Sequence, residues 1–140
     1  AKAMVERAKR NAELSGVARE NTRYIIDDCA AFVAREIRRG NKYDAVIMDP
    51  PSYGRGPNGE VWRTEDDLFA FVKEVSGVLS EKPLFVLINS YTTGLQPTVI
   101  ANTLSLAMPE GGKVRAYELA LPTGDKRVNL PCGCSGLITY

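Results

Sequence analysis

The sequence contains no histidine and only three cysteines, Cys29, Cys132 and Cys134. Two thiols one residue apart, with one distant thiol besides, do not supply the ligand set of a zinc site, so we predict that the chain binds no metal. An odd number of cysteines fits the reducing cytosol, which predicts a cytoplasmic protein.

Long apolar runs and strong net charge are missing as well. No apolar run reaches the length that crosses a bilayer and no stretch resembles a signal peptide, so we expect no membrane partner. The net charge of +1 gives no strong basic field toward nucleic acid. Positive charge is concentrated in the first third, where it is typical of solvated helix surface: Lys2, Arg7, Lys9, Arg10, Arg35, Arg38 and Arg39.

The remaining composition, 44% hydrophobic and 25% charged over 140 residues, fits one globular domain. Apolar periodicity and turn residues predict helices at 1–14, 29–40, 64–80 and 97–108, and strands at 22–28, 45–48, 83–91, 113–121 and 135–140. This alternation predicts an α/β fold with a parallel, helix-flanked sheet, in which the last two strands form an antiparallel hairpin across a loop at 122–135.

Two local signals refine these helices. In the third helix Thr64 and Asp67 approximate a capping box, and its buried stripe is Leu68, Val72, Val75 and Leu79. The first helical pattern begins without the Ser, Thr, Asp or Asn that usually opens a helix. We therefore expect that upstream sequence is missing and that residues 1–140 are the carboxyl-terminal portion of one domain.

Polar clusters follow three of the predicted strands at their carboxyl ends, where open α/β sheets bind ligands. They are Asp27-Asp28, the segment 49–53 and the segment 89–91. The middle cluster follows the continuous apolar run 45–48, which is typical of a central strand buried on both faces, and its two prolines end that strand. We predict a functional site there.

The order of these clusters, with "DPPSYGRG" after one strand and "NSYTTGL" after the next, resembles class I S-adenosylmethionine-dependent methyltransferases, and more narrowly the bacterial ribosomal RNA large-subunit methyltransferases. The resemblance covers nearly all 140 residues. It implies a Rossmann-like methyltransferase sheet, mostly parallel with an antiparallel carboxyl-terminal hairpin, that lacks the first two strands. It also implies S-adenosylmethionine as the cofactor and a base of ribosomal RNA as the substrate.

The same resemblance implies roles for individual residues. Asp28 would accept a hydrogen bond from the cofactor's adenine amino group, and the small Cys29 beside it would leave room for the ring. Asp49 would lie against the cofactor and, with the Pro50 carbonyl, polarise the target amine, while Tyr53 would stack on a flipped target base. Further residues that would bind substrate are Arg55, Trp62, Asn89 and Tyr91.

Each role has a structural alternative. Asp28 would instead cap the following helix, and Tyr53 would pack in the core after a motif that merely ends a strand. The glycines at 54, 56 and 59 predict a flexible loop that could fold over substrate, with Arg55 and Arg63 meeting phosphates and Trp62 stacking on a base. In the alternative the arginines belong to a surface turn and Trp62 anchors the core.

The sequence departs from the family pattern in two ways. Relatives that methylate carbon five of a pyrimidine carry a cysteine just after the fifth strand, where this chain has Asn89-Ser90-Tyr91, so a nitrogen or oxygen target is favoured. In the family, a glycine-rich loop after the first strand holds the methionine part of the cofactor, and an acid at the end of the second strand holds the ribose hydroxyls. Both are absent from this sequence. We therefore expect the isolated chain to be inactive, to bind the cofactor weakly or not at all, and to expose sheet edges that could self-associate.

Two other functions fit the same fold. One is a methyltransferase that acts on a small molecule or a protein, and the other is a non-enzymatic α/β binding module that has lost the cofactor loop. An RNA-binding domain upstream would favour RNA as the substrate. A glycine-rich strand-loop motif immediately upstream would exclude the binding module.

Overall fold

The computed structural model describes residues 2–56 and 59–140. Its helices are α1 (Lys2–Leu14), α2 (Cys29–Arg39), α3 (Thr64–Ser76) and α4 (Pro97–Ala107). Its strands are β1 (Ala45–Met48), β2 (Tyr53–Arg55), β3 (Val61–Arg63), β4 (Phe85–Ser90), β5 (Lys113–Pro122) and β6 (Asn129–Thr139). All four predicted helices are therefore confirmed, although Ala1, where the first prediction begins, lies outside the described residues.

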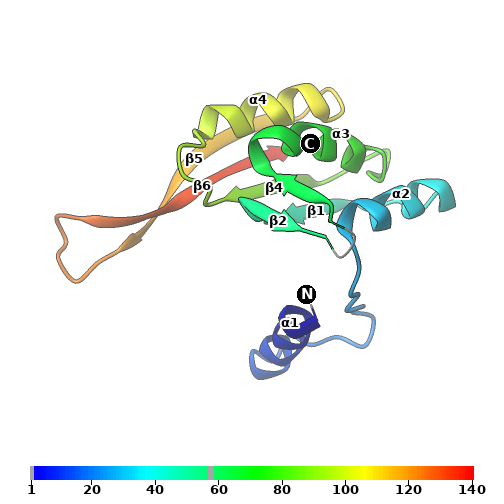
Figure 1. Ribbon diagram of the computed structural model, residues 1–140, viewed down its shortest axis with the longest axis horizontal. Coiled ribbons are helices and arrows are strands. Elements are labelled where there is room, and N and C mark those ends of the chain that lie inside the picture. The colour runs from blue at the N-terminus through cyan, green and yellow to red at the C-terminus, as the bar shows by residue number, and fades with distance from the viewer. Residues whose placement is uncertain (1, 57–58) are drawn as a thin grey trace.

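The main sheet has four strands in the order β1-β4-β6-β5 (Figure 1). β1 and β4 are parallel and in register from Ala45 opposite Phe85 to Met48 opposite Ile88. β6 lies antiparallel between β4 and β5, which makes the last two strands the predicted hairpin. The α/β fold class is confirmed, and the parallel pair directs the carboxyl ends of β1 and β4 to one edge.

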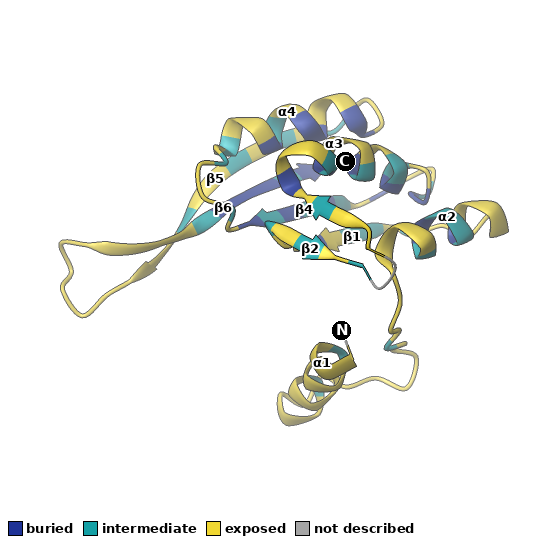
Figure 2. Cartoon of the chain, in the orientation of Figure 1, coloured by how far each residue is buried: buried dark blue, intermediate teal, exposed yellow. Residues whose placement is uncertain are grey.

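One face of this sheet is covered by α2, α3 and α4, whose apolar sides form a single core with it (Figure 2). Val72 and Val75 of α3 and Ile100 and Leu104 of α4 are at most 2% exposed, as is Ile88 of β4. The predicted stripe of α3 is confirmed as buried, although Leu79 lies beyond the helix end at Ser76.

The opposite face of the sheet is less covered, and this corrects the prediction of a central strand buried on both sides. Ile47 of β1 is 65% exposed, and Phe85 and Leu87 of β4 are half-buried. β1 is an edge strand of the described sheet, because no strand pairs with its outer side. The apolar residues of the run 45–48 point to both faces of the sheet, and in this structure only the face toward the helices is covered.

The strand predicted at 22–28 is wrong. This segment has no strand assignment, and Ile25 and Ile26 are 40% and 53% exposed. A strand needs a neighbour to accept its backbone hydrogen bonds, and the segment neither reaches the free edge of β1 nor pairs with any other described strand. Helix α1 precedes it and stands apart from the sheet, with no buried residue (Figure 1).

The carboxyl-terminal hairpin is longer than predicted. Its ladder continues past a bulge between Glu118 and Ala120 to a pair between Pro122 and Asn129, so most of the predicted loop at 122–135 is strand. The distal half of this ribbon projects beyond the sheet, and residues 120–132 are exposed (Figures 1 and 2). Proline is tolerated in such a ribbon because its missing N–H faces solvent.

Candidate active site at the carboxyl edge of the sheet

The turn that follows β1 is held in place by its neighbours. Pro50 is buried, whereas Asp49 is exposed at the end of the strand. The carbonyl oxygen of Pro51 accepts two hydrogen bonds, from Trp62 Nε1 at 2.7 Å and from Thr64 Oγ1 at 2.8 Å. Because Pro51 also has a fixed φ, the turn has little freedom, and the backbone of Asp49 is held at the sheet edge.

These bonds also show where the predicted capping box was wrong. Thr64 is the first helical residue and its hydroxyl bonds to the turn, while the residue before the helix is Arg63, which makes no side-chain cap. Asp67 does satisfy one backbone donor at this end, since its Oδ2 accepts from the Arg63 N–H at 2.7 Å.

The predicted glycine loop is a short antiparallel hairpin. Tyr53 pairs with Arg63, Gly54 with Trp62 and Arg55 with Val61. Trp62 is half-buried, and its ring meets Phe71 edge-on with 5.8 Å between centroids. Its indole N–H is already engaged, so the structure places Trp62 as an anchor of the hairpin, and stacking on a base stays a prediction.

Tyr53 does not pack in the core, because it is 50% exposed. Its hydroxyl accepts a hydrogen bond from Arg55 Nε at 2.7 Å, and the Arg55 guanidinium carbon is 6.0 Å from the ring centroid. This exposed ring, four residues after Asp49 in the sequence, is available to a planar ligand. The structural alternative for Tyr53 is therefore excluded, while its contact with a target base stays a prediction.

The neighbouring strand end, after β4, carries the third cluster. Asn89 is half-buried, and its Oδ1 accepts a hydrogen bond from the Ser135 hydroxyl at 2.5 Å. Tyr91 is 60% exposed. The two turns are joined directly, since Ser52 Oγ and Thr92 Oγ1 are 2.9 Å apart. The structure thus brings the second and third clusters together at one edge, as the parallel arrangement predicted.

Two open hollows lie beside this junction, of about 600 and 480 Å³. Both are lined by the segment 92–95 after β4. The larger one continues to Glu118 and to the segment 131–134, and the smaller one reaches from Ser52 to Glu65. A ligand at the end of β1 would therefore have space on the side of β4, between walls that carry hydroxyl and carboxylate groups.

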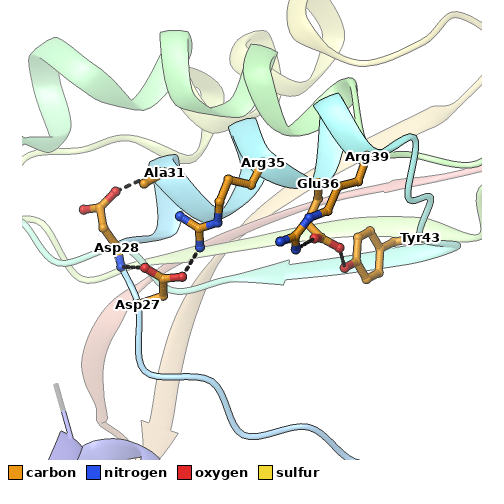
Figure 3. Close-up of polar contacts among 7 residues, drawn as sticks. All are labelled: Asp27, Asp28, Ala31, Arg35, Glu36, Arg39 and Tyr43. Atoms are coloured by element: carbon orange, nitrogen blue, oxygen red, sulfur yellow. Dashed lines mark hydrogen bonds and ion pairs between the residues drawn. The ribbon is translucent and has the colours of Figure 1, made fainter.

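Asp28 lies at the amino terminus of α2, and its side chain caps this helix (Figure 3). Its Oδ1 accepts from the Ala31 N–H at 2.8 Å, and Asp27 accepts from the Asp28 N–H while pairing with Arg35. The capping alternative is therefore correct. It does not exclude a ligand, because a carboxylate has two acceptor oxygens and both Asp28 and Cys29 are exposed.

The other end of α2 holds a polar cluster that no sequence motif predicted. Glu36 is 2% exposed and accepts hydrogen bonds from Tyr43 Oη at 2.5 Å, Asn41 Nδ2 at 2.8 Å and Arg39 at 3.1 Å. The Tyr43 hydrogen bond, followed by the Asn41 bond, lowers the pKa of Glu36 against the effect of burial. The cluster joins the end of α2 to the start of β1, so α2 runs back along the sheet and directs Asp28 toward the carboxyl edge (Figure 3).

Two further properties bear on ligands. No helix within residues 2–56 and 59–140 is long and apolar enough to span a membrane. Over the same residues no three potential metal-ligating side chains lie together.

The comparisons with known proteins point to one class. No protein-family model matches the chain. Over 46 residues it is 33% identical to the ribosomal RNA large subunit methyltransferase I of Aeromonas hydrophila subsp. hydrophila, a match that covers 33% of this chain and 12% of that protein. The SAM-dependent methyltransferase from Agrobacterium tumefaciens superposes with a TM-score of 0.86 at 29% identity, over 99% of this chain and 46% of that one. A methyltransferase structure from Streptococcus mutans gives 0.69 at 18% identity, over 94% and 34%.

These matches confirm the resemblance to class I S-adenosylmethionine-dependent methyltransferases, including the narrower resemblance to the ribosomal RNA large-subunit enzymes. The Streptococcus structure supports the fold alone, whereas the Agrobacterium structure adds sequence similarity along almost the whole chain. The chain spans less than half the length of either structure.

Proposed function

We propose that the protein transfers a methyl group from S-adenosylmethionine to a nitrogen or oxygen atom of an RNA base, with Asp49, Pro50 and Tyr53 at the reacting centre. The observation that carries this proposal is the position of Asp49. Its exposed carboxylate ends a strand that is parallel to its neighbour, on a turn held by two hydrogen bonds to Pro51, in a chain that superposes on methyltransferases.

The described residues fit one part of the cofactor. Asp28 and Cys29 are exposed at the amino terminus of α2, where a carboxylate and a small neighbour suit the adenine amino group and ring. When bound, S-adenosylmethionine supplies an electrophilic methyl group on a sulfonium sulfur. The residues of this chain would therefore have to orient the acceptor.

Asp49 and Pro50 are suited to that task. The Asp49 carboxylate would accept a hydrogen bond from the N–H of the target amine, which orients the nitrogen lone pair toward the methyl carbon. As the nitrogen–carbon bond formed, the carbon–sulfur bond of the sulfonium would break, and the amine proton would pass to the carboxylate or to water. Pro50 offers the second acceptor, because the Pro51 carbonyl is already used by Trp62 and Thr64. Catalysis in this arrangement is mainly positioning of the two reactants.

RNA is the substrate that two features favour. The 46-residue match is to a ribosomal RNA methyltransferase, and Tyr53, four residues after Asp49, presents an exposed ring on which a flipped base can stack. The segment after β4 contains no cysteine, so a nitrogen or oxygen atom is the proposed target. In this proposal Asn89 and Tyr91, at the end of β4, would contact the substrate from that side, and the proposed setting is the cytoplasm.

The test is methyl transfer from labelled S-adenosylmethionine to ribosomal RNA taken from cells that lack the protein. In the intact protein, Asp49→Ala should lower the single-turnover rate by about 100- to 10,000-fold, because the variant loses the acceptor that orients the target amine. Asp44→Ala is the matched control, since Asp44 precedes β1 at the opposite edge of the sheet. A rate for Asp49→Ala equal to the wild-type rate would contradict the proposal.

A further inference from the structure

The hairpin of β2 and β3 has one outer face that carries two arginines and a tyrosine. Tyr53 lies opposite Arg63 and Arg55 lies opposite Val61, and paired residues of an antiparallel ladder share a face. All four are exposed, Tyr53 at 50% and Val61 at 46%. We refer to these four residues as the hairpin face.

The other side of the hairpin fixes it to the domain. Gly54 and Trp62 occupy this inner side, and Trp62 bonds to the Pro51 carbonyl and packs on Phe71. The backbone of Arg63 is also held by Asp67. The hairpin face is therefore a preorganised surface, and the Pro51 carbonyl connects it directly to the turn that carries Asp49.

The chemistry of the hairpin face suits a nucleic acid strand. A guanidinium presents several N–H donors in a plane, which matches phosphate oxygens, and an aromatic ring with an adjacent guanidinium can stack on bases. Arg55 and Arg63 are diagonal neighbours in the ladder, so their backbones are about 7–8 Å apart and their long side chains can reach separate phosphates.

The negative charge around the two hollows also favours the hairpin face as the binding surface for the RNA backbone. The smaller hollow on the side of β4 is bordered by Glu65, and the larger one by Glu118, and both carboxylates repel phosphate. A strand whose base enters the edge at Asp49 would keep its phosphates away from these hollows. The hairpin face is an adjacent surface on which two arginines, Arg55 and Arg63, offer positive charge.

We propose that the hairpin face binds the sugar-phosphate backbone that flanks the target nucleotide in a single-stranded RNA segment, with Arg55 and Arg63 on phosphates. This inference rests on the proposed function for its biological setting. Its physical content is separate, because binding of RNA can be measured without methyl transfer.

The experiment measures binding of a fluorescein-labelled single-stranded RNA 12-mer to the intact protein by fluorescence anisotropy, without cofactor, over a series of salt concentrations. Affinity falls as salt rises, and each lost phosphate contact makes the slope of log affinity against log salt less steep by about 0.7. At 0.1 M salt this corresponds to about fivefold weaker binding than that of the wild-type protein. We expect this loss for Arg55→Gln and for Arg63→Gln. Arg63→Lys should retain the slope, because it keeps the charge.

Lys82→Gln is the matched control, since it removes one positive charge before β4, at the opposite edge of the sheet. An unchanged slope in both arginine variants, or an equal loss in Lys82→Gln, would overturn the proposal. Two outcomes separate this proposal from the proposed function. If the arginine variants lose RNA binding but the wild-type protein methylates no RNA, the hairpin face is supported and the proposed function is refuted. If the wild-type protein methylates RNA but both arginine variants bind RNA as well as wild type, the proposed function is supported and the hairpin face is refuted.

Discussion

Replacing Gly133 by alanine should destabilise the chain and disturb the site edge. Gly133 lies in β6 where the projecting ribbon enters the sheet, and its φ is +108°. A Cβ atom there would lie 2.1 Å from the Ser90 carbonyl oxygen and 2.9 Å from the Tyr91 Cα. Both are backbone atoms at the end of β4, so no side-chain rotation relieves the contact.

The expected cost has two parts. A positive φ at a residue with a side chain costs about 1–2 kcal/mol. Forcing the backbone of β4 away adds about 1–3 kcal/mol, as in overpacked cores. The free energy of unfolding should therefore fall by about 2–5 kcal/mol in total.

Two other glycines separate these parts. Gly111 has a φ of +95° with nothing within 4 Å of the added Cβ, so Gly111→Ala should show the conformational cost alone. Gly124, in the turn of the ribbon, has neither a positive φ nor a neighbour within 4 Å, and its replacement should stay within about 0.5 kcal/mol of wild type.

Urea unfolding followed by circular dichroism gives the three midpoints, which can be compared if the denaturant slopes agree. The expected order of destabilisation is Gly124→Ala, then Gly111→Ala, then Gly133→Ala. Equal losses for Gly133→Ala and Gly111→Ala would refute the argument from close approach to β4.

Three further predictions concern the site and α2. Asp28→Ala should weaken cofactor binding in calorimetric titrations of the intact protein and cost about 1 kcal/mol of stability. Asp28→Ser should restore the helix cap and its stability but not the cofactor binding. Equal cofactor affinities in wild type and both variants would contradict the cofactor role. Replacing all three cysteines by serine should leave methyl transfer measurable, because burial raises the pKa of the Cys134 thiol and a thiol nucleophile is not part of the proposal, while complete loss in a folded variant would indicate a covalent step. The lowered pKa of Glu36 stabilises the fold above its ordinary value of 4.5, and this contribution is lost as the pH falls through the lowered value. Glu36→Gln should therefore flatten the acid side of the stability curve between pH 7 and 3, and parallel curves for the two proteins would argue against it.

Local signals predicted the helices well. Gly40 adopts the left-handed conformation that ends α2, and Pro97 opens α4 in its first turn. Both act through the backbone of neighbouring residues, so no distant partner is needed to identify them. The apolar stripe of α3 was identified for a related reason, since helical periodicity alone determines which side chains share a face.

Strands were predicted less well because pairing is not local. The apolar segment at 22–28 has strand composition but no partner in the described sheet, whereas Tyr53–Arg55 and Val61–Arg63 pair although glycines predicted a loop. Prolines at 122 and 131 concealed the distal ribbon in the same way. The composition of a segment shows whether it is compatible with a strand, but the strand forms only where a neighbouring strand pairs with it.

The site was predictable in its position but not in its contacts. Parallel strands place Asp49 and Asn89 at adjacent ends, and the sequence order alone indicates this. The double use of the Pro51 carbonyl by Trp62 and Thr64 could not be predicted, because it depends on the path of the hairpin between them.

The entry of β6 into the sheet divides this strand into two parts that should tolerate change very differently. Residues 129–132 are exposed on the ribbon, while Cys134, Ser135 and Gly136 are buried within two to four residues of them. A label or short peptide inserted in the turn at 123–128 would meet only solvent, so it could report on motions of the ribbon without altering the core. The same insertion next to Ser135 would break the hydrogen bond between Ser135 and Asn89 and disrupt the sheet edge that carries the site.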